Sequence, residues 1–143
     1  MRQTAAYGRT AFLLLAVSGL AQTVANPLVG TWHNIEAPPI PQTLLMIGAD
    51  GYYSQIAIPP GRSKPRNGWD HRTREELMKQ FGGVRASYGT WKVAGNRLTR
   101  MRTASEDPGN EGTETVVEFR FDGDVLVLKS QDTQREARFR RMK

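Results

Sequence analysis

Short segments in which apolar and polar residues alternate, separated by glycine, proline and aspartate, fill most of this chain beyond its first 25 residues. Alternation with period two is typical of strands that bury one face, and close spacing of such strands is typical of β-sandwiches and β-barrels. Asp50-Gly51 is a strong hairpin signal between two of the segments. We expect strands at residues 30–36, 42–48, 52–58, 86–93, 97–104, 113–121, 125–130 and 134–141.

Eight consecutive strands are enough to close an up-and-down antiparallel β-barrel, which leaves no exposed sheet edge. A length of 143 residues predicts one such domain. The chain has no cysteine and only two histidines, which excludes thiol catalysis and thiolate metal sites and leaves little for a zinc site. We therefore expect no metal and no cofactor, while the net charge of +6 favours weak attraction to anions.

Residues 1–25 have the pattern of a secretory signal peptide. Two arginines and no acidic residue precede the apolar stretch 11–20, which is too short to span a bilayer. Small residues allow cleavage after Ala21 or Ala25, and the second position leaves residues 26–143 as the domain. An uncleaved N-terminal anchor is the alternative. The leader predicts a periplasmic or secreted protein without an integral membrane segment after cleavage, and export argues against a nucleic-acid partner.

One helical segment, at residues 73–81, interrupts the strands between the third and the fourth. Thr73 and Glu76 have the spacing of a capping box, and Gly82-Gly83 is typical of a helix end. The apolar residues on one face of this helix are Leu77, Met78 and Phe81. That face needs a surface to cover, which is either the open mouth of the barrel or its outer wall.

Gly30-x-Trp32 on the first strand, together with an arginine late on the last strand, resembles the signature of the lipocalin and calycin barrels. The resemblance implies that Gly30 allows close approach, that Trp32 packs across the barrel base, and that an arginine lies over the indole ring. A guanidinium over an indole gains a cation–π contact. The partner expected here is Arg141, with Arg138 and Arg140 as alternatives.

Further motifs along residues 28–141 are similar, in the same order, to those of the bacterial and fungal lipocalin-like domain family. They are Leu28-Val29-Gly30-Thr31-Trp32, Asp50-Gly51-Tyr52, Pro60-Gly61-Arg62, Thr73-x-Glu75-Glu76-Leu77 and Gly89-x-Trp91-x-Val93. The leading hypothesis is a binding protein for a small apolar or amphipathic molecule held inside the barrel. An isomerase or cyclase acting on an apolar intermediate in the same pocket, and a cavity-less domain that binds another envelope protein, are the alternatives.

The inner wall is expected to carry the residues that would contact such a ligand. Alternation places Val117 and Phe119 on one inward face of their strand and Trp91 on that of another, and we assign Met101 to the inner face as well. An eight-stranded barrel either fills its interior with side chains or encloses one small ligand. These residues therefore predict an apolar pocket or, equally, a packed core.

Strand 97–104 is strongly basic, and the direction of its arginines follows from that of Met101. If Met101 points inward, Arg100 and Arg102 point outward, where Glu114 and Glu118 of the adjacent strand offer ion pairs. The alternative is an interior that binds an anion, as in carriers that hold the carboxylate of a fatty acid.

The long connection before the helix, residues 59–70, combines basic and aromatic side chains. It is expected to border the entrance to the barrel, and a solvated surface loop is the alternative. The residues of this region expected to contact a ligand are Arg62, Trp69 and Phe81. Asp70 and His71 are weak candidates for an acid–base pair, since no nucleophile motif accompanies them.

Overall fold

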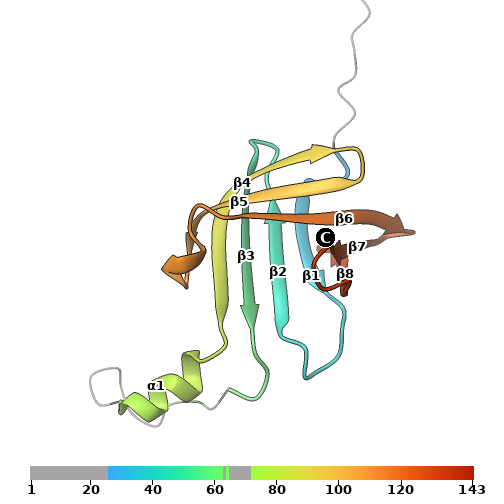
Figure 1. The fold of residues 1–143 in the computed structure, drawn as a ribbon. Coiled ribbons are helices and arrows are strands. Elements are labelled where there is room, and N and C mark those ends of the chain that lie inside the picture. Colours follow the sequence, from blue (N-terminus) through green and yellow to red (C-terminus); the bar gives the residue numbers. More distant parts are fainter. Residues whose placement is uncertain (1–25, 63, 65–71) are drawn as a thin grey trace, which may run out of the picture.

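In the computed structural model, which describes residues 26–62, 64 and 72–143, the chain forms a closed antiparallel barrel (Figure 1). Each strand pairs with the next one along the chain, and the last pairs back with the first. The strands are β1 (Gly30–Asn34), β2 (Gln42–Ile47), β3 (Tyr52–Ile58), β4 (Arg85–Ala94), β5 (Arg97–Ser105), β6 (Glu114–Asp122), β7 (Val125–Ser130) and β8 (Glu136–Arg141). The helix α1 (Arg74–Phe81) lies between β3 and β4, and the 3-10 helix η2 (Pro108–Asn110) between β5 and β6. The predicted fold class is therefore confirmed; the expected signal peptide lies outside the described residues.

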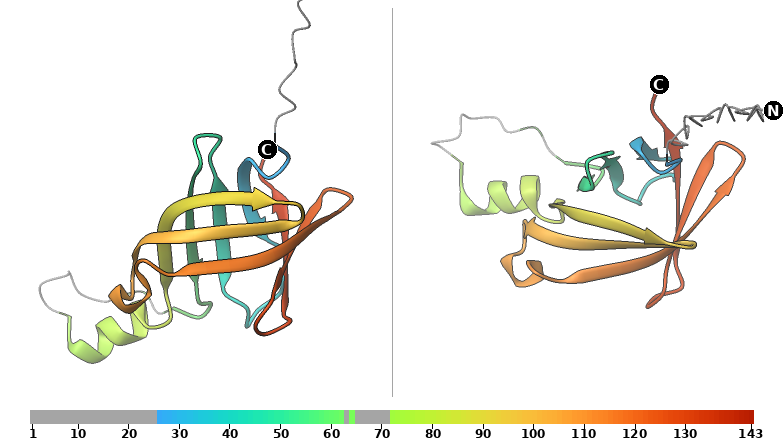
Figure 2. Two further views of the ribbon diagram at one scale, coloured as in Figure 1. Left: turned by 45° about the horizontal axis from the view of Figure 1, so that its top comes forward. Right: turned by 90° about the horizontal axis from the view of Figure 1, so that it is seen from above.

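β4 is the longest strand, and it takes part in two walls of the barrel. It first runs beside β3 and then bends over to cross the barrel with β5 (Figure 2). The pairing with β5 shifts by a bulge between Tyr88 and Gly89. Gly89 is buried, and a side chain at this position would overlap the carbonyl oxygen of Met101 on β5. Glycine is therefore needed where the two walls meet.

The end of the barrel around Trp32, which we call the base, is closed by a contact between the first and last strands. The Trp32 side chain is buried, and its Nε1 donates a hydrogen bond of 2.8 Å to the carbonyl oxygen of Leu28. The guanidinium carbon of Arg141 lies 4.3 Å from the centre of the indole ring, and the same group donates to the carbonyl oxygens of Pro27 and Val29. Of the three arginines that the sequence left open, Arg141 is the one that covers the tryptophan.

The half of the barrel next to the base is filled by apolar side chains that alternate along the strands. Its buried members are Leu28, Trp32, Leu45, Ile47, Tyr53, Leu98, Val117, Leu126, Leu128 and Phe139. Trp91, Val93, Phe119 and Ala137 pack against this cluster. Trp91 also donates from Nε1 to the carbonyl oxygen of Gly48 at 2.9 Å, which connects β4 to the turn between β2 and β3. A packed core, one of the two possibilities raised by the sequence, is thus what this half contains.

The outer face of β7 is covered by charged side chains from its two neighbours. Val127 lies between Arg120 of β6 and Arg138 of β8 and faces away from the core, yet none of its surface is exposed. Arg120 pairs with Glu136 at 2.7 Å, and Arg138 pairs with Asp122 at 3.2 Å. The aliphatic stems of the two arginines can exclude water from the valine while their charged ends remain hydrated and paired.

The helix α1 forms where the capping signals predict it but does not present its apolar face to the barrel. The Thr73 side chain accepts from the backbone N–H of Glu76, whose carboxylate accepts from the Thr73 N–H, so the capping box is complete. α1 lies beyond the ends of β3 and β4 (Figure 1), and Met78 and Phe81 stay exposed. Instead Gln80 is buried, because Arg72 donates to its side-chain oxygen at 2.7 Å and Arg62 to its backbone oxygen. The expected burial of the apolar face is therefore wrong for Met78 and Phe81, while Leu77 is half-buried.

Closure of the base can be tested at Gly30, which has a φ of 148° and lies directly under Arg141. A Gly30→Ala change should lower the free energy of unfolding by about 2–4 kcal/mol, because it adds backbone strain and a collision with the guanidinium. Gly95→Ala is the control: it also has a positive φ, 60°, but nothing lies near its added methyl group, so about 1–2 kcal/mol is expected.

Chemical denaturation of both variants, alone and combined with Arg141→Ala, separates the two effects. In the absence of Arg141 the cost of Gly30→Ala should fall toward that of the control, since the collision is removed. An unchanged cost in that background would contradict the proposed contact.

Candidate functional site

The opposite end of the barrel, which we call the mouth, contains a cavity of about 300 Å³. Its lining includes residues at the start of β4 and at the end of β5. Figure 1 shows that the connections from β3 to β4 and from β5 to β6 leave the barrel on the side of α1. The side chains that line its inner part are Tyr53, Gln55, Ser87, Arg100, Arg102 and Thr115. Most of these groups are polar, so the mouth differs from the apolar half of the barrel below it.

Arg100 is the most deeply placed charge of this mouth cavity. Its Nη1 donates to the side-chain oxygen of Gln55, and its guanidinium carbon lies 5.4 Å from the centre of the Tyr53 ring. Its Nε is inaccessible to solvent and has no acceptor among the described residues. Burial lowers the pKa of Arg100, Tyr53 opposes this effect and the positive charge of Arg102 adds to it. An arginine nevertheless remains protonated in proteins, so the cavity contains a buried positive charge.

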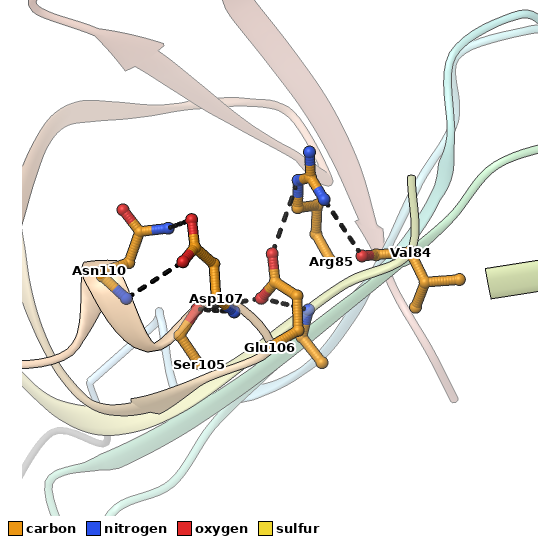
Figure 3. Close-up of polar contacts among 8 residues, drawn as sticks. Val84, Arg85, Ser105, Glu106, Asp107 and Asn110 are labelled. Atoms are coloured by element: carbon orange, nitrogen blue, oxygen red, sulfur yellow. Dashed lines mark hydrogen bonds and ion pairs between the residues drawn. The ribbon is translucent and has the colours of Figure 1, made fainter. Parts of the chain in front are cut away.

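The carboxylate that lines the cavity, Glu106, is already committed to other partners (Figure 3). Its Oε2 accepts hydrogen bonds of 2.9 Å from the backbone N–H of Ala86 and from the hydroxyl of Ser105, and its Oε1 lies 3.5 Å from Nε of Arg85. Desolvation raises the pKa of Glu106, but these hydrogen bonds and Arg85 outweigh it, so the pKa is lowered. Glu106 therefore stays ionised and is held at the rim by Arg85.

No ion pair joins Arg100 or Arg102 to a carboxylate in the part of the chain that the structure describes. Arg102 donates instead to the hydroxyl of Thr113, at 2.7 Å. Both arginines lie on the inner face of β5, two residues apart, and both line the mouth cavity. Within the described residues, neither of these two positive charges is therefore paired with a carboxylate.

The prediction that Met101 points inward and the arginines outward is wrong. The two-residue turn Gly95-Asn96 pairs Ala94 with Arg97, and this register places Arg100 opposite Trp91. Since Trp91 faces the interior, so does Arg100, and Met101 lies on the outer wall beside Lys92. Glu114, one of the expected partners of the arginines, pairs with Lys92 at 3.6 Å instead.

The other residues predicted to contact a ligand are not brought together at the mouth cavity. Trp91, Val117 and Phe119 face the interior as expected, but they belong to the packed half of the barrel. Arg62 is exposed and lies over the ring of Phe81 at 5.5 Å, within the connection that carries α1. The candidates outside the described residues are Trp69, Asp70 and His71.

Neither family models nor curated proteins give a match to this chain. Within residues 26–62, 64 and 72–143 no three histidine, aspartate or glutamate side chains are grouped as metal ligands would be. Across the same ranges, no helix has the length and apolar character needed to cross a bilayer.

The unmatched charge of Arg100 should be visible as a cost to stability. We expect Arg100→Met to raise the free energy of unfolding of the ligand-free protein by about 1 kcal/mol, because it removes a poorly compensated buried charge and keeps a long apolar stem. Arg97→Met, at an exposed position of the same strand, is the matched control and should change stability by less than about 0.5 kcal/mol. Thermal denaturation measures both; destabilisation by Arg100→Met would mean that the guanidinium is satisfied within the protein.

Proposed function

We propose that this chain is an exported, lipocalin-like binding protein that takes a small organic anion into the mouth of its barrel. The observation that carries the proposal is Arg100, a half-buried arginine at the inner end of a cavity, whose Nε is inaccessible to solvent and which has no acidic partner among the described residues. The polar lining favours a small anion over the apolar members of the class that the sequence suggested, a small apolar or amphipathic molecule.

Physical chemistry supports a binding role for this arginine. A buried charge without a counter-charge is expensive, and proteins retain such groups chiefly where a ligand completes their environment. A carboxylate or phosphate in the cavity would accept from the free Nε of Arg100 and form charge-assisted hydrogen bonds, which are stronger than those between neutral groups. Binding would therefore satisfy a polar group that has no partner among the described residues.

The size of the cavity agrees with a small-molecule ligand. A volume of about 300 Å³ is at the lower end of ordinary ligand pockets. The export part of the proposal rests on the leader-like pattern of residues 1–25, and the lipocalin-like part on the resemblance of the motifs between residues 28 and 141. The export part and the lipocalin-like part do not depend on the anion site, so a failure of any one of the three leaves the other two in place.

Ligand-induced stabilisation tests the anion site. We expect short carboxylates and phosphate esters to raise the melting temperature of the wild-type protein in proportion to the logarithm of their concentration above Kd, because they bind the folded state only. Their neutral amide and alcohol analogues should have little effect, and Arg100→Met should abolish the response to the anions. Arg97→Met is the control and should respond like the wild type.

Two results would contradict the proposal. One is an absence of stabilisation by any anion of such a panel, and the other is an equal response in the wild type and in Arg100→Met. Native mass spectrometry of protein purified from its own host provides a second route, because a retained anion should be lost in the Arg100→Met variant.

A further inference from the structure

The charges that line the mouth cavity do not balance. Arg85 and Glu106 form a pair at the rim, so their charges cancel. Arg100 and Arg102 remain, and in the described residues neither has a carboxylate partner. The cavity therefore carries an excess of two positive charges, and a ligand with one negative charge would neutralise only half of it.

The spacing of the two arginines limits how far apart the charges of a ligand can be. Arg100 and Arg102 are successive inward positions on β5, so their backbones lie roughly 7 Å apart along the strand. Each also has a fixed neighbour, since Arg100 donates to Gln55 and Arg102 to Thr113. A ligand with two negatively charged groups a few ångströms apart could therefore contact both guanidiniums while Arg100 keeps its hydrogen bond to Gln55 and Arg102 keeps its hydrogen bond to Thr113.

The packed half of the barrel limits the size of the ligand. Leu98 and Val117 are buried below the arginines, and Trp91 packs against them, so the cavity has no apolar extension toward the base. A long acyl chain would find no space there. Ser87 and Thr115, by contrast, line the cavity with hydroxyl groups that can donate to additional oxygen atoms.

We propose that the ligand of the mouth cavity is a compact organic dianion, with one negative charge on Arg100 and the other on Arg102. This inference rests on the proposed function and adds the charge and size of the ligand. Dicarboxylates and phosphate monoesters share this chemistry: a dicarboxylate has one charge on each of two carboxylates, and a phosphate monoester has a charge of about −1.5 to −2 at neutral pH on the oxygens of one phosphoryl group.

Isothermal titration calorimetry with size-matched probes tests the charge requirement. Succinate is compared with butyrate, and glycerol 3-phosphate with its methyl diester, so that each dianion has a monoanion of similar shape. We expect at least one dianion to bind about 10- to 100-fold more tightly than its partner, the range that one additional charged hydrogen bond contributes. The two pairs are titrated separately, so tighter binding of glycerol 3-phosphate points to a phosphate monoester and tighter binding of succinate points to a dicarboxylate.

Two variants test which arginine binds each negative charge of the ligand. Arg102→Gln should reduce the affinity for the dianion to that of the monoanion and leave the monoanion nearly unaffected, whereas Arg100→Gln should weaken both. Arg97→Gln, on the same strand but exposed, is the control and should change neither. Melting temperatures of the variants show that each remains folded.

The outcomes separate this inference from the proposed function. Equal binding of dianions and monoanions, with both lost in Arg100→Gln, overturns the dianion inference and leaves the anion site in place. A preference for the dianion that persists in Arg102→Gln also overturns it, as does the absence of binding by both dianions. Dependence of the preference on Arg102 supports it.

Discussion

The contact between Trp32 and Arg141 reinforces the seam at which β1 pairs with β8 and the sheet closes on itself. The two residues are directly opposite in the pairing of β1 with β8, and the guanidinium lies over the indole while it bonds to the carbonyl oxygens of Pro27 and Val29. It therefore fixes the segment before β1 as well as the seam. A closed barrel has no free strand edge, which removes the usual route to edge-to-edge aggregation.

The interior of the closed barrel differs in polarity between the base and the mouth. Next to Trp32 the barrel is apolar and filled, and the burial of these side chains provides the stability that a domain of this size needs. Toward the mouth the same inner face carries Arg100 and Arg102, which we expect to weaken the fold in the absence of a ligand. The proposed binding function would account for a stable base and a less stable mouth on continuous strands.

The strands and the helix could be predicted because their signals are local, namely period-two alternation, turn glycines and a capping box. The binding face could not be read from hydrophobicity, because choosing Met101 as the inward residue reversed the whole of β5. The turn Gly95-Asn96 contained the missing signal: two turn residues set Trp91 opposite Arg100, so an inward Trp91 requires an inward Arg100. The burial of Gln80 in α1 depends on distant arginines and has no local signal.

The ion pairs over β7 have a consequence for how a dissolved anion would encounter this protein. Arg120, Arg138 and Arg140 are each paired with a carboxylate, so the outer wall around β7 produces little net electric field. The unneutralised charges of Arg100 and Arg102 instead lie inside low-dielectric walls, which concentrate their field lines at the opening. If the proposed anion site is correct, an approaching anion should be guided to the cavity over the last Debye length rather than held on the surface, and its rate of association should decline as ionic strength rises.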